Sequence, residues 1–151
     1  MDTMKSLLTF PQKLLIKEYN AISETTFLNL LKSNSLLGLF FSAQWCPPCV
    51  QFTPILLDFY NKVNKDKKQI EIIFISHDEE EKEFDEYYKD MPWAAVPYDF
   101  DDREDISESF NIIGVPTFVV VNSKGKLVDA KGKVTILNDG IKAIDKWNEK
   151  K

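Results

Sequence analysis

LLGLFFSAQWCPPC, residues 36–49, joins a short apolar run to two cysteines that are separated by two prolines. The run at 36–41 lies between polar segments, which is typical of a strand buried on both faces of a sheet. Pro47 and Pro48 suit the first turn of a helix, because neither has a backbone N–H and both have φ near the helical value. The stretch therefore predicts a buried strand, a turn that carries the cysteines, and a helix that starts at the turn.

Hydrophobic spacing outlines the rest of the chain. The predicted helix after the cysteines continues with apolar residues on one side, namely Phe52, Leu56, Phe59, Tyr60 and Val63. Pro54 lies within it and predicts a kink. Further strand candidates occupy residues 70–75, 118–121 and 126–130, with an additional one around 14–19. A further helix is predicted to start at 23–26. Others are predicted over 79–89, with Asp78 as cap, over about 102–110 and over about 138–147. Residues 91–97 are predicted to form an ordered loop, and 122–125 the turn of an antiparallel hairpin.

Strands and helices alternate along most of this pattern. That alternation predicts an α/β fold, with a central mixed sheet flanked by helices on both faces. A length of 151 residues suits one hydrophobic core, so we expect a single domain over 1–151. Residues 1–11 and 146–151 are the candidates for loose tails.

The composition narrows the classes of partner. A net charge of -5 disfavours nucleic acid and anionic membranes, because phosphate binding needs clustered Lys and Arg. No apolar run approaches the roughly 20 residues that cross a bilayer, and the N-terminus lacks the apolar core of a signal peptide. We therefore expect a cytoplasmic protein, with the nucleus as a further possible location.

The chemistry expected of the chain centres on Cys46 and Cys49. A helix N-terminus favours negative charge, so a thiol at Cys46 is placed to react as a thiolate. Cys49, one turn further into the helix, is expected to be more buried and to attack a mixed disulfide formed at Cys46. Trp45 either shields one side of the sulfur pair or is an ordinary half-buried aromatic residue.

Two other uses of the cysteine pair are disfavoured. A structural zinc site takes four ligands, whereas the chain has one histidine, His77, and no second cysteine pair. A structural disulfide closing so small a loop would constrain the unfolded chain very little. We therefore expect no metal and no organic cofactor, because the cysteine pair is itself the redox group.

At these residues the sequence resembles tryparedoxins and nucleoredoxins, which are members of the thioredoxin superfamily. The resemblance covers roughly residues 35–140 and is carried by 45–49 with 52–54, 78–79, 91–98, 114–117 and 132–134. It implies a thioredoxin fold in which Cys46 is the nucleophile and Cys49 the resolving cysteine. It also implies a cis bond between Val115 and Pro116 beside the dithiol, where backbone groups would pair with an extended substrate. Without the resemblance, Pro116 reads equally well as an ordinary proline at the start of a strand.

The chain departs from these families at three positions. Phe40 stands where plain thioredoxins carry a buried Asp, so any proton relay to Cys49 needs water or another group such as Asp78 or Glu79. His77 replaces a Trp of tryparedoxins, and Val50 replaces the Arg that follows their second cysteine. These two changes put recognition of trypanothione in doubt.

The function expected from these features is thiol–disulfide exchange. The first hypothesis is a monomeric protein-disulfide reductase that passes electrons from a low-molecular-weight thiol or a reductase to protein disulfides such as those of peroxiredoxins. The second is a redox-controlled protein-binding module of nucleoredoxin type, and a thiol peroxidase is a weaker third. The sequence leaves the reduction potential open, and with it the direction of electron transfer.

Overall fold

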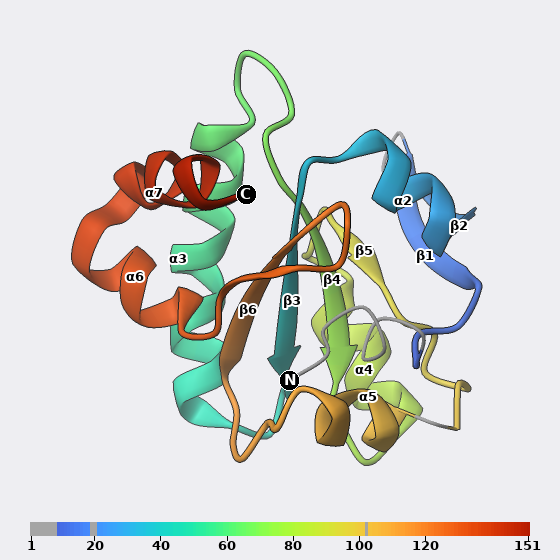
Figure 1. Ribbon diagram of the computed structural model, residues 1–151. Coiled ribbons are helices and arrows are strands. Elements are labelled where there is room, and N and C mark those ends of the chain that lie inside the picture. Colours follow the sequence, from blue (N-terminus) through green and yellow to red (C-terminus); the bar gives the residue numbers. More distant parts are fainter. Residues whose placement is uncertain (1–8, 19–20, 102) are drawn as a thin grey trace.

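The computed structural model describes residues 9–18, 21–101 and 103–151 (Figure 1). Its strands form one sheet in the order β2-β1-β5-β4-β3-β6-β7. β3 and β4 are parallel, as are β4 and β5, whereas the other neighbouring pairs are antiparallel. The strands are β1 (Lys13–Glu18), β2 (Ala21–Thr26), β3 (Leu36–Ser42), β4 (Glu71–Ser76), β5 (Ala94–Ala95), β6 (Thr117–Asn122) and β7 (Leu127–Asp129).

Helices cover both faces of this sheet. They are α2 (Phe27–Ser33), α3 (Pro47–Val63), α4 (Glu81–Tyr88), α5 (Arg103–Ser109), α6 (Gly132–Asp139), the 3₁₀ helix η1 (Gly140–Lys142) and α7 (Ala143–Lys150). One core cluster joins the sheet to α3, α4, α6 and α7, and the other joins it to α2 and α5. Alternate residues of β3 enter opposite clusters: Phe40 belongs to the first and Phe41 to the second. The predicted α/β fold with a mixed, doubly covered sheet is confirmed.

Several predicted elements lie where the sequence placed them. β3 is buried at every position, as is β4, and the hairpin of β6 and β7 is present. The apolar side of α3 is buried at all five predicted positions, and the helix runs through Pro54 without interruption. The kink expected at Pro54 stays a prediction.

The helix start predicted at 23–26 is confirmed at Thr26, which caps α2: its side chain accepts a hydrogen bond from the Asn29 N–H at 3.1 Å. The strand β2 over the preceding residues was not predicted. Three other expectations about secondary structure are wrong. Asp78 does not cap α4; Glu80 does, in a capping box with Glu83. Within 91–97 the chain forms β5, which pairs with both β1 and β4. The single helix expected at 138–147 is the end of α6 followed by η1 and α7.

The expected loose tails are also revised. Residues 146–150 lie within α7, whose Trp147 is fully buried, and Phe10 is buried near the other end. Residues 1–8 of the expected N-terminal tail lie outside the described residues, as do Tyr19 and Asp102, which bounded two predicted elements. None of the helices that the structure describes is long and apolar enough to span a membrane.

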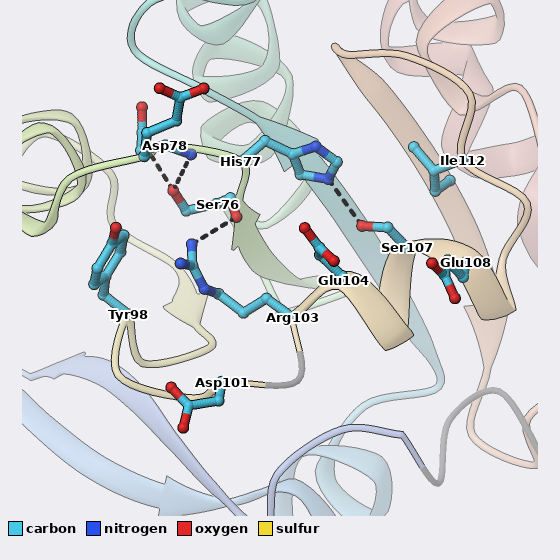
Figure 2. A pocket seen from close by; sticks show the side chains of 11 residues that line it. Ser76, His77, Asp78, Tyr98, Asp101, Arg103, Glu104, Ser107, Glu108 and Ile112 are labelled. Atoms are coloured by element: carbon cyan, nitrogen blue, oxygen red, sulfur yellow. Dashed lines mark hydrogen bonds between the residues drawn. The ribbon is translucent and has the colours of Figure 1, made fainter.

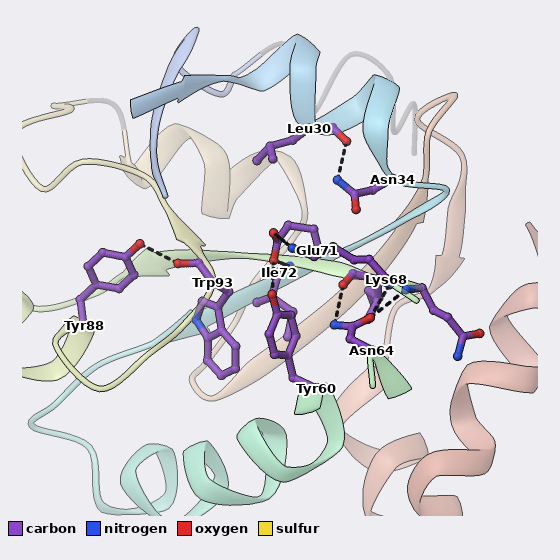
Figure 3. Close-up of polar contacts among 11 residues, drawn as sticks. Leu30, Asn34, Tyr60, Asn64, Lys68, Glu71, Ile72, Tyr88 and Trp93 are labelled. Carbon is purple, nitrogen blue, oxygen red and sulfur yellow. Dashed lines mark hydrogen bonds and ion pairs between the residues drawn. The ribbon is translucent and has the colours of Figure 1, made fainter. Parts of the chain in front are cut away.

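A polar network anchors the end of β4 that is remote from the cysteines (Figure 3). The buried Glu71 carboxylate accepts hydrogen bonds from Tyr60 Oη at 2.9 Å and from Lys68 Nζ at 2.5 Å. Because buried carboxylates are costly unless paired, these contacts hold the start of β4 against the end of α3. β4 then runs from this anchor to Ser76, at the edge of the sheet where the cysteines lie.

Candidate active site

The cysteine turn lies at the carboxyl end of β3. Cys46 is the N-cap of α3, and its carbonyl accepts the first helical hydrogen bond from the Val50 N–H at 3.1 Å. Pro47 and Pro48 occupy the first two helical positions and are exposed. Their missing N–H groups cost nothing at a helix start, which explains how this sequence ends a strand and begins a helix within four residues.

The two cysteines differ in burial as expected. Cys46 keeps 6% of its surface exposed, whereas Cys49 is fully buried, and both are free thiols in the structure. Cys46 is therefore the more accessible of the two sulfurs.

The 114–117 segment meets Cys46 from the far side of the turn. The Val115–Pro116 peptide bond is cis, as the resemblance implied. Cys46 Sγ donates to the Val115 carbonyl oxygen at 3.7 Å, and Val115 packs against the small cluster of Ala43, Cys46 and Cys49. The tertiary structure thus brings together two predicted site segments that lie 69 residues apart in the chain.

Trp45 lies at the surface beside Cys46. Its side chain is 52% exposed, and its indole N–H donates to the His77 carbonyl at 3.1 Å. The ring is therefore held at one end while much of its apolar surface meets solvent. Ile113, two residues before Val115, is fully exposed. No sequence signal marked Ile113, because one apolar residue in a loop has no periodicity to report its exposure.

The surroundings of Cys49 favour the protonated form of its thiol. Burial raises the pKa of the Cys49 thiol to about 11, and a hydrogen bond with Cys46 adds to the rise. Hydrogen bonds from the Ser42 hydroxyl and the Ala43 backbone act in the opposite direction, because they stabilise the thiolate. Sequence analysis missed Ser42, which reads only as the last residue of a strand.

Phe40, in the place of the buried Asp of thioredoxins, belongs to the apolar core. Its ring packs edge-on against Phe52 and Trp93 and is tilted against Phe74. The core beneath the cysteine turn is therefore aromatic at this position and offers no carboxylate.

Asp78, which the sequence suggested as a proton relay to Cys49, makes hydrogen bonds to other groups. Its carboxylate accepts the Gln44 N–H and the Ser76 hydroxyl, each at 2.7 Å. Burial raises the pKa of Asp78, although both hydrogen bonds oppose the rise. These bonds tie the loop after β4 to the loop that leads into the cysteines, so Asp78 fixes the backbone of the site. Glu79 is exposed and lines a neighbouring cavity.

That cavity, of about 680 Å³, opens between the loop after β4, α5 and Ile112 (Figure 2). Arg103 donates to the Ser76 carbonyl at 2.9 Å and lies over the Tyr98 ring. The His77 ring is bonded to the Ser107 hydroxyl at 2.8 Å, and its pKa is lowered by burial and then by Arg103. His77 is therefore a partnered, neutral side chain near pH 7, which favours a structural role over a catalytic one.

Over residues 9–18, 21–101 and 103–151, no three His, Cys, Asp or Glu side chains are grouped to hold a metal ion.

Comparison with known proteins places this geometry in a family. The sequence pattern of a family described as thioredoxin-like matches residues 34–127, which is more than half of the chain. The chain belongs to the thioredoxin-like family. Nucleoredoxin of Mus musculus is 40% identical over 114 residues, which are 72% of this chain and 26% of that protein. Tryparedoxin of Trypanosoma brucei brucei is 39% identical over 121 residues, which are 75% of this chain and 82% of that protein.

Solved structures agree with this thioredoxin-like assignment. Tryparedoxin II from C. fasciculata matches with a TM-score of 0.78 and 31% identity over 94% of this chain and 92% of that one. A tryparedoxin II complexed with glutathionylspermidine matches with a TM-score of 0.79 and 30% identity over 93% and 94%. The fold is therefore a thioredoxin fold, and the close cysteine pair fits a redox motif. The chain spans about a quarter of the length of the nucleoredoxins that it matches, such as 26% of the mouse protein.

Proposed function

We propose that the chain is a protein-disulfide reductase of the tryparedoxin and nucleoredoxin group. The observation that carries this proposal is the asymmetry of the two thiols. Cys46 caps a helix at the protein surface beside the Val115 carbonyl, and Cys49 lies fully buried one turn behind it. Cys46 attacks a partner disulfide, and Cys49 then attacks Cys46 and releases the reduced partner.

Three surface features support binding of a protein substrate. The exposed indole of Trp45, next to Cys46 in the chain, and the exposed side chain of Ile113, two residues before Val115, offer apolar contact area. Val115 presents its carbonyl to the reacting sulfur, where an extended peptide of the partner also has to lie. Disulfides of proteins such as peroxiredoxins are the substrates that we propose, with a low-molecular-weight thiol or a reductase as electron donor. The cysteine pair serves as the redox group without a cofactor.

The test compares wild type with two variants, on a disulfide-containing protein substrate with dithiothreitol as donor. Wild type should reduce the substrate with turnover, and Cys49→Ser should stop turnover and accumulate a mixed disulfide at Cys46, seen on non-reducing gels. Cys46→Ser should neither turn over nor form an adduct. Equal turnover in wild type and in both single variants would refute the proposal.

The direction of electron transfer is tested by the reduction potential of the pair. Equilibration against glutathione, followed by Trp45 fluorescence, should give a value near or below about -220 mV for a reductase. A value near about -150 mV would indicate an oxidant or isomerase instead.

A second candidate function is a redox-controlled binding module. It is favoured by the exposed apolar side chains of Trp45 and Ile113, which are 52% and fully exposed. If a partner trapped by Cys49→Ser still binds when both cysteines are replaced by serine, binding rather than turnover is the function of this surface.

A further inference from the structure

Trp45, next to Cys46 in the chain, exposes a large apolar ring, and its value for binding depends on how firmly that ring is held. A side chain that rotates freely loses this freedom when a partner binds, which weakens binding, whereas a side chain already fixed in its bound position does not. The Trp45 indole is 52% exposed, and its N–H donates to the His77 carbonyl at 3.1 Å. The rigidity of the His77 carbonyl therefore decides how far the ring is preorganised for a partner.

His77 lies just beyond the end of β4, where the sheet gives the backbone less support. The last paired residue of β4 is Ser76, opposite Ser42 of β3. The His77 N–H still donates to the Ser42 carbonyl at 2.9 Å. The His77 carbonyl itself accepts the Trp45 indole. Its direction therefore depends on how the side chains of this short segment are restrained.

The His77 side chain supplies such a restraint. Its Nε2 is hydrogen-bonded to the Ser107 hydroxyl at 2.8 Å (Figure 2). The imidazole ring also packs edge-on against Phe41, with ring centroids 6.2 Å apart and planes at 89°. Ser107 lies on α5 and is buried, and Phe41 lies on β3 and is fully buried. The ring is therefore held between a helix and the sheet.

A second contact from α5 holds the residue before His77. Arg103 donates to the Ser76 carbonyl at 2.9 Å, and its guanidinium lies 4.1 Å from the centroid of the Tyr98 ring. Two side chains of α5, one turn apart, thus contact two consecutive residues at the end of β4. This helix belongs to the core cluster on the opposite side of the sheet from α3. The path from α5 to the exposed indole therefore crosses the edge of the sheet.

We propose that Ser107 and the His77 side chain are positioning residues, which hold the Trp45 indole in the orientation that binds a protein substrate. Both act through the His77 carbonyl and leave the chemistry at Cys46 to other groups. The inference rests on the proposed reductase function. It adds residues that set the affinity for a protein substrate without setting the rate of exchange.

The test uses pairs of variants that differ in this one hydrogen bond. Gln carries its amide nitrogen as many bonds from the backbone as His carries Nε2, so His77→Gln keeps a partner for Ser107. The amide of Asn ends one bond earlier, where Nδ1 stood, so His77→Asn loses the contact. Ser107→Ala removes the other partner. Ser109→Ala is its control, because it removes a hydroxyl of the same helix that donates to the Ile106 carbonyl at 2.8 Å.

Quenching of tryptophan fluorescence by iodide measures the position of the indole directly. Trp93 and Trp147 are 1% and 0% exposed, so iodide in solution reports Trp45. Ser107→Ala and His77→Asn should raise the quenching constant, because an indole with a less rigid acceptor spends more time away from the protein. His77→Gln should keep the value of wild type. Trp45→Phe confirms the assignment if it removes the quenching.

Reduction of insulin, with dithiothreitol as donor, measures the effect on a protein substrate. Ser107→Ala and His77→Asn should raise KM about threefold or more, within the range expected for the loss of one neutral hydrogen bond, and leave kcat within about twofold of wild type. Their reaction with bis(2-hydroxyethyl) disulfide, followed by acid quench and mass spectrometry, should also stay within about twofold, since so small a disulfide reaches Cys46 without covering the indole.

Every outcome decides between these explanations. Wild-type quenching in both Ser107→Ala and His77→Asn would overturn the proposal, and so would raised quenching with an unchanged KM for insulin. Losses in His77→Gln equal to those in His77→Asn, or in Ser109→Ala equal to those in Ser107→Ala, would show that packing of α5 and not this hydrogen bond is responsible. If wild type fails to reduce insulin with turnover, the proposed reductase function has failed, while the quenching comparison still decides whether Ser107 holds Trp45.

Discussion

The position of each cysteine on α3 decides how accessible its thiol is. Cys46 and Cys49 are three positions apart, yet Cys46 keeps 6% of its surface exposed and bonds the Val115 carbonyl, while Cys49 is fully buried. The difference arises because Cys46 is the N-cap, where side chains point out of the helix, whereas Cys49 lies on the face of α3 that packs on the sheet. Two identical thiols thereby differ in how accessible they are.

Alkylation should report this difference directly. In reduced wild type at pH 7, iodoacetamide should modify Cys46 and leave Cys49 unmodified. In Cys46→Ser, modification of Cys49 should be slow at pH 7 and speed up as pH rises toward about 11, because burial raises its pKa from the ordinary 9.0. Mass spectrometry of peptides measures both sites. Rapid modification of Cys49 in the folded variant at pH 7 would contradict the burial that we describe.

At the scale of elements, the ring of Phe118 limits which residues fit where α6 packs on the sheet. Phe118, fully buried on β6, lies between Gly38 of β3 and Gly132 of α6. A Cβ on Gly132 would lie 2.7 Å from Phe118 Cδ2 and 2.9 Å from its carbonyl oxygen, and a Cβ on Gly38 would overlap the ring. Both glycines are therefore required by close approach and not by backbone conformation.

Gly38→Ala should destabilise the protein by about 1–3 kcal/mol, which is typical of overpacking in a core. Urea unfolding of the reduced protein measures the change. Gly114→Ala is the control, because nothing lies within 4 Å of a Cβ at that position, and it should change stability by less than about 0.5 kcal/mol. Adding Phe118→Leu to Gly38→Ala should recover part of the loss. A Gly38→Ala variant as stable as wild type would contradict the packing.

At the scale of the whole molecule, hydrogen bonds of Asp129 connect β7 to the C-terminal helices α6 and α7. Its carboxylate accepts hydrogen bonds from Thr135 Oγ1 at 2.6 Å and Trp147 Nε1 at 2.9 Å, and from the Lys131 N–H at 2.8 Å. Burial by itself would raise the pKa of Asp129, but these hydrogen bonds outweigh it and lower the pKa below the ordinary 3.8. A lowered pKa in the folded state means that the ionised form stabilises the fold.

The stabilisation from Asp129 should therefore be complete above about pH 4 and decline as pH falls through the lowered pKa. Asp129→Asn should cost about 1–2 kcal/mol at pH 7, and the difference from wild type should shrink below pH 4. Denaturant unfolding at several pH values measures this difference. Asp139→Asn, which removes a surface ion pair with Lys146, serves as control and should cost less than about 1 kcal/mol. A difference that stays constant with pH would show that Asp129 acts through packing alone.

The local hydrophobic pattern was enough to predict the elements that have a uniformly buried strand or helix face. β3, β4 and the apolar side of α3 were predicted because a run of apolar residues, or one with helical spacing, has few alternatives. Pattern failed to reveal β2, because its polar residues suit a helix start, which Thr26 provides, and their pairing with β1 has no local signal. It also failed at Ala94–Ala95, because a two-residue strand exists only through its neighbours β1 and β4. Cross-strand pairing is a property of distant segments and leaves no local signal.

The sequence by itself determined where the chemistry resides, because a cysteine pair with two prolines at the junction of a buried strand and a helix is recognisable without coordinates. The tertiary structure decided what surrounds that pair. Only folding places Val115 against Cys46 and joins Ser42, Tyr87 and Thr53 beside Cys49. These residues come from four separate segments, and each is ordinary in its own stretch of sequence. A hydrogen bond between segments far apart in the chain depends on how the layers pack, and that information is spread over the entire core.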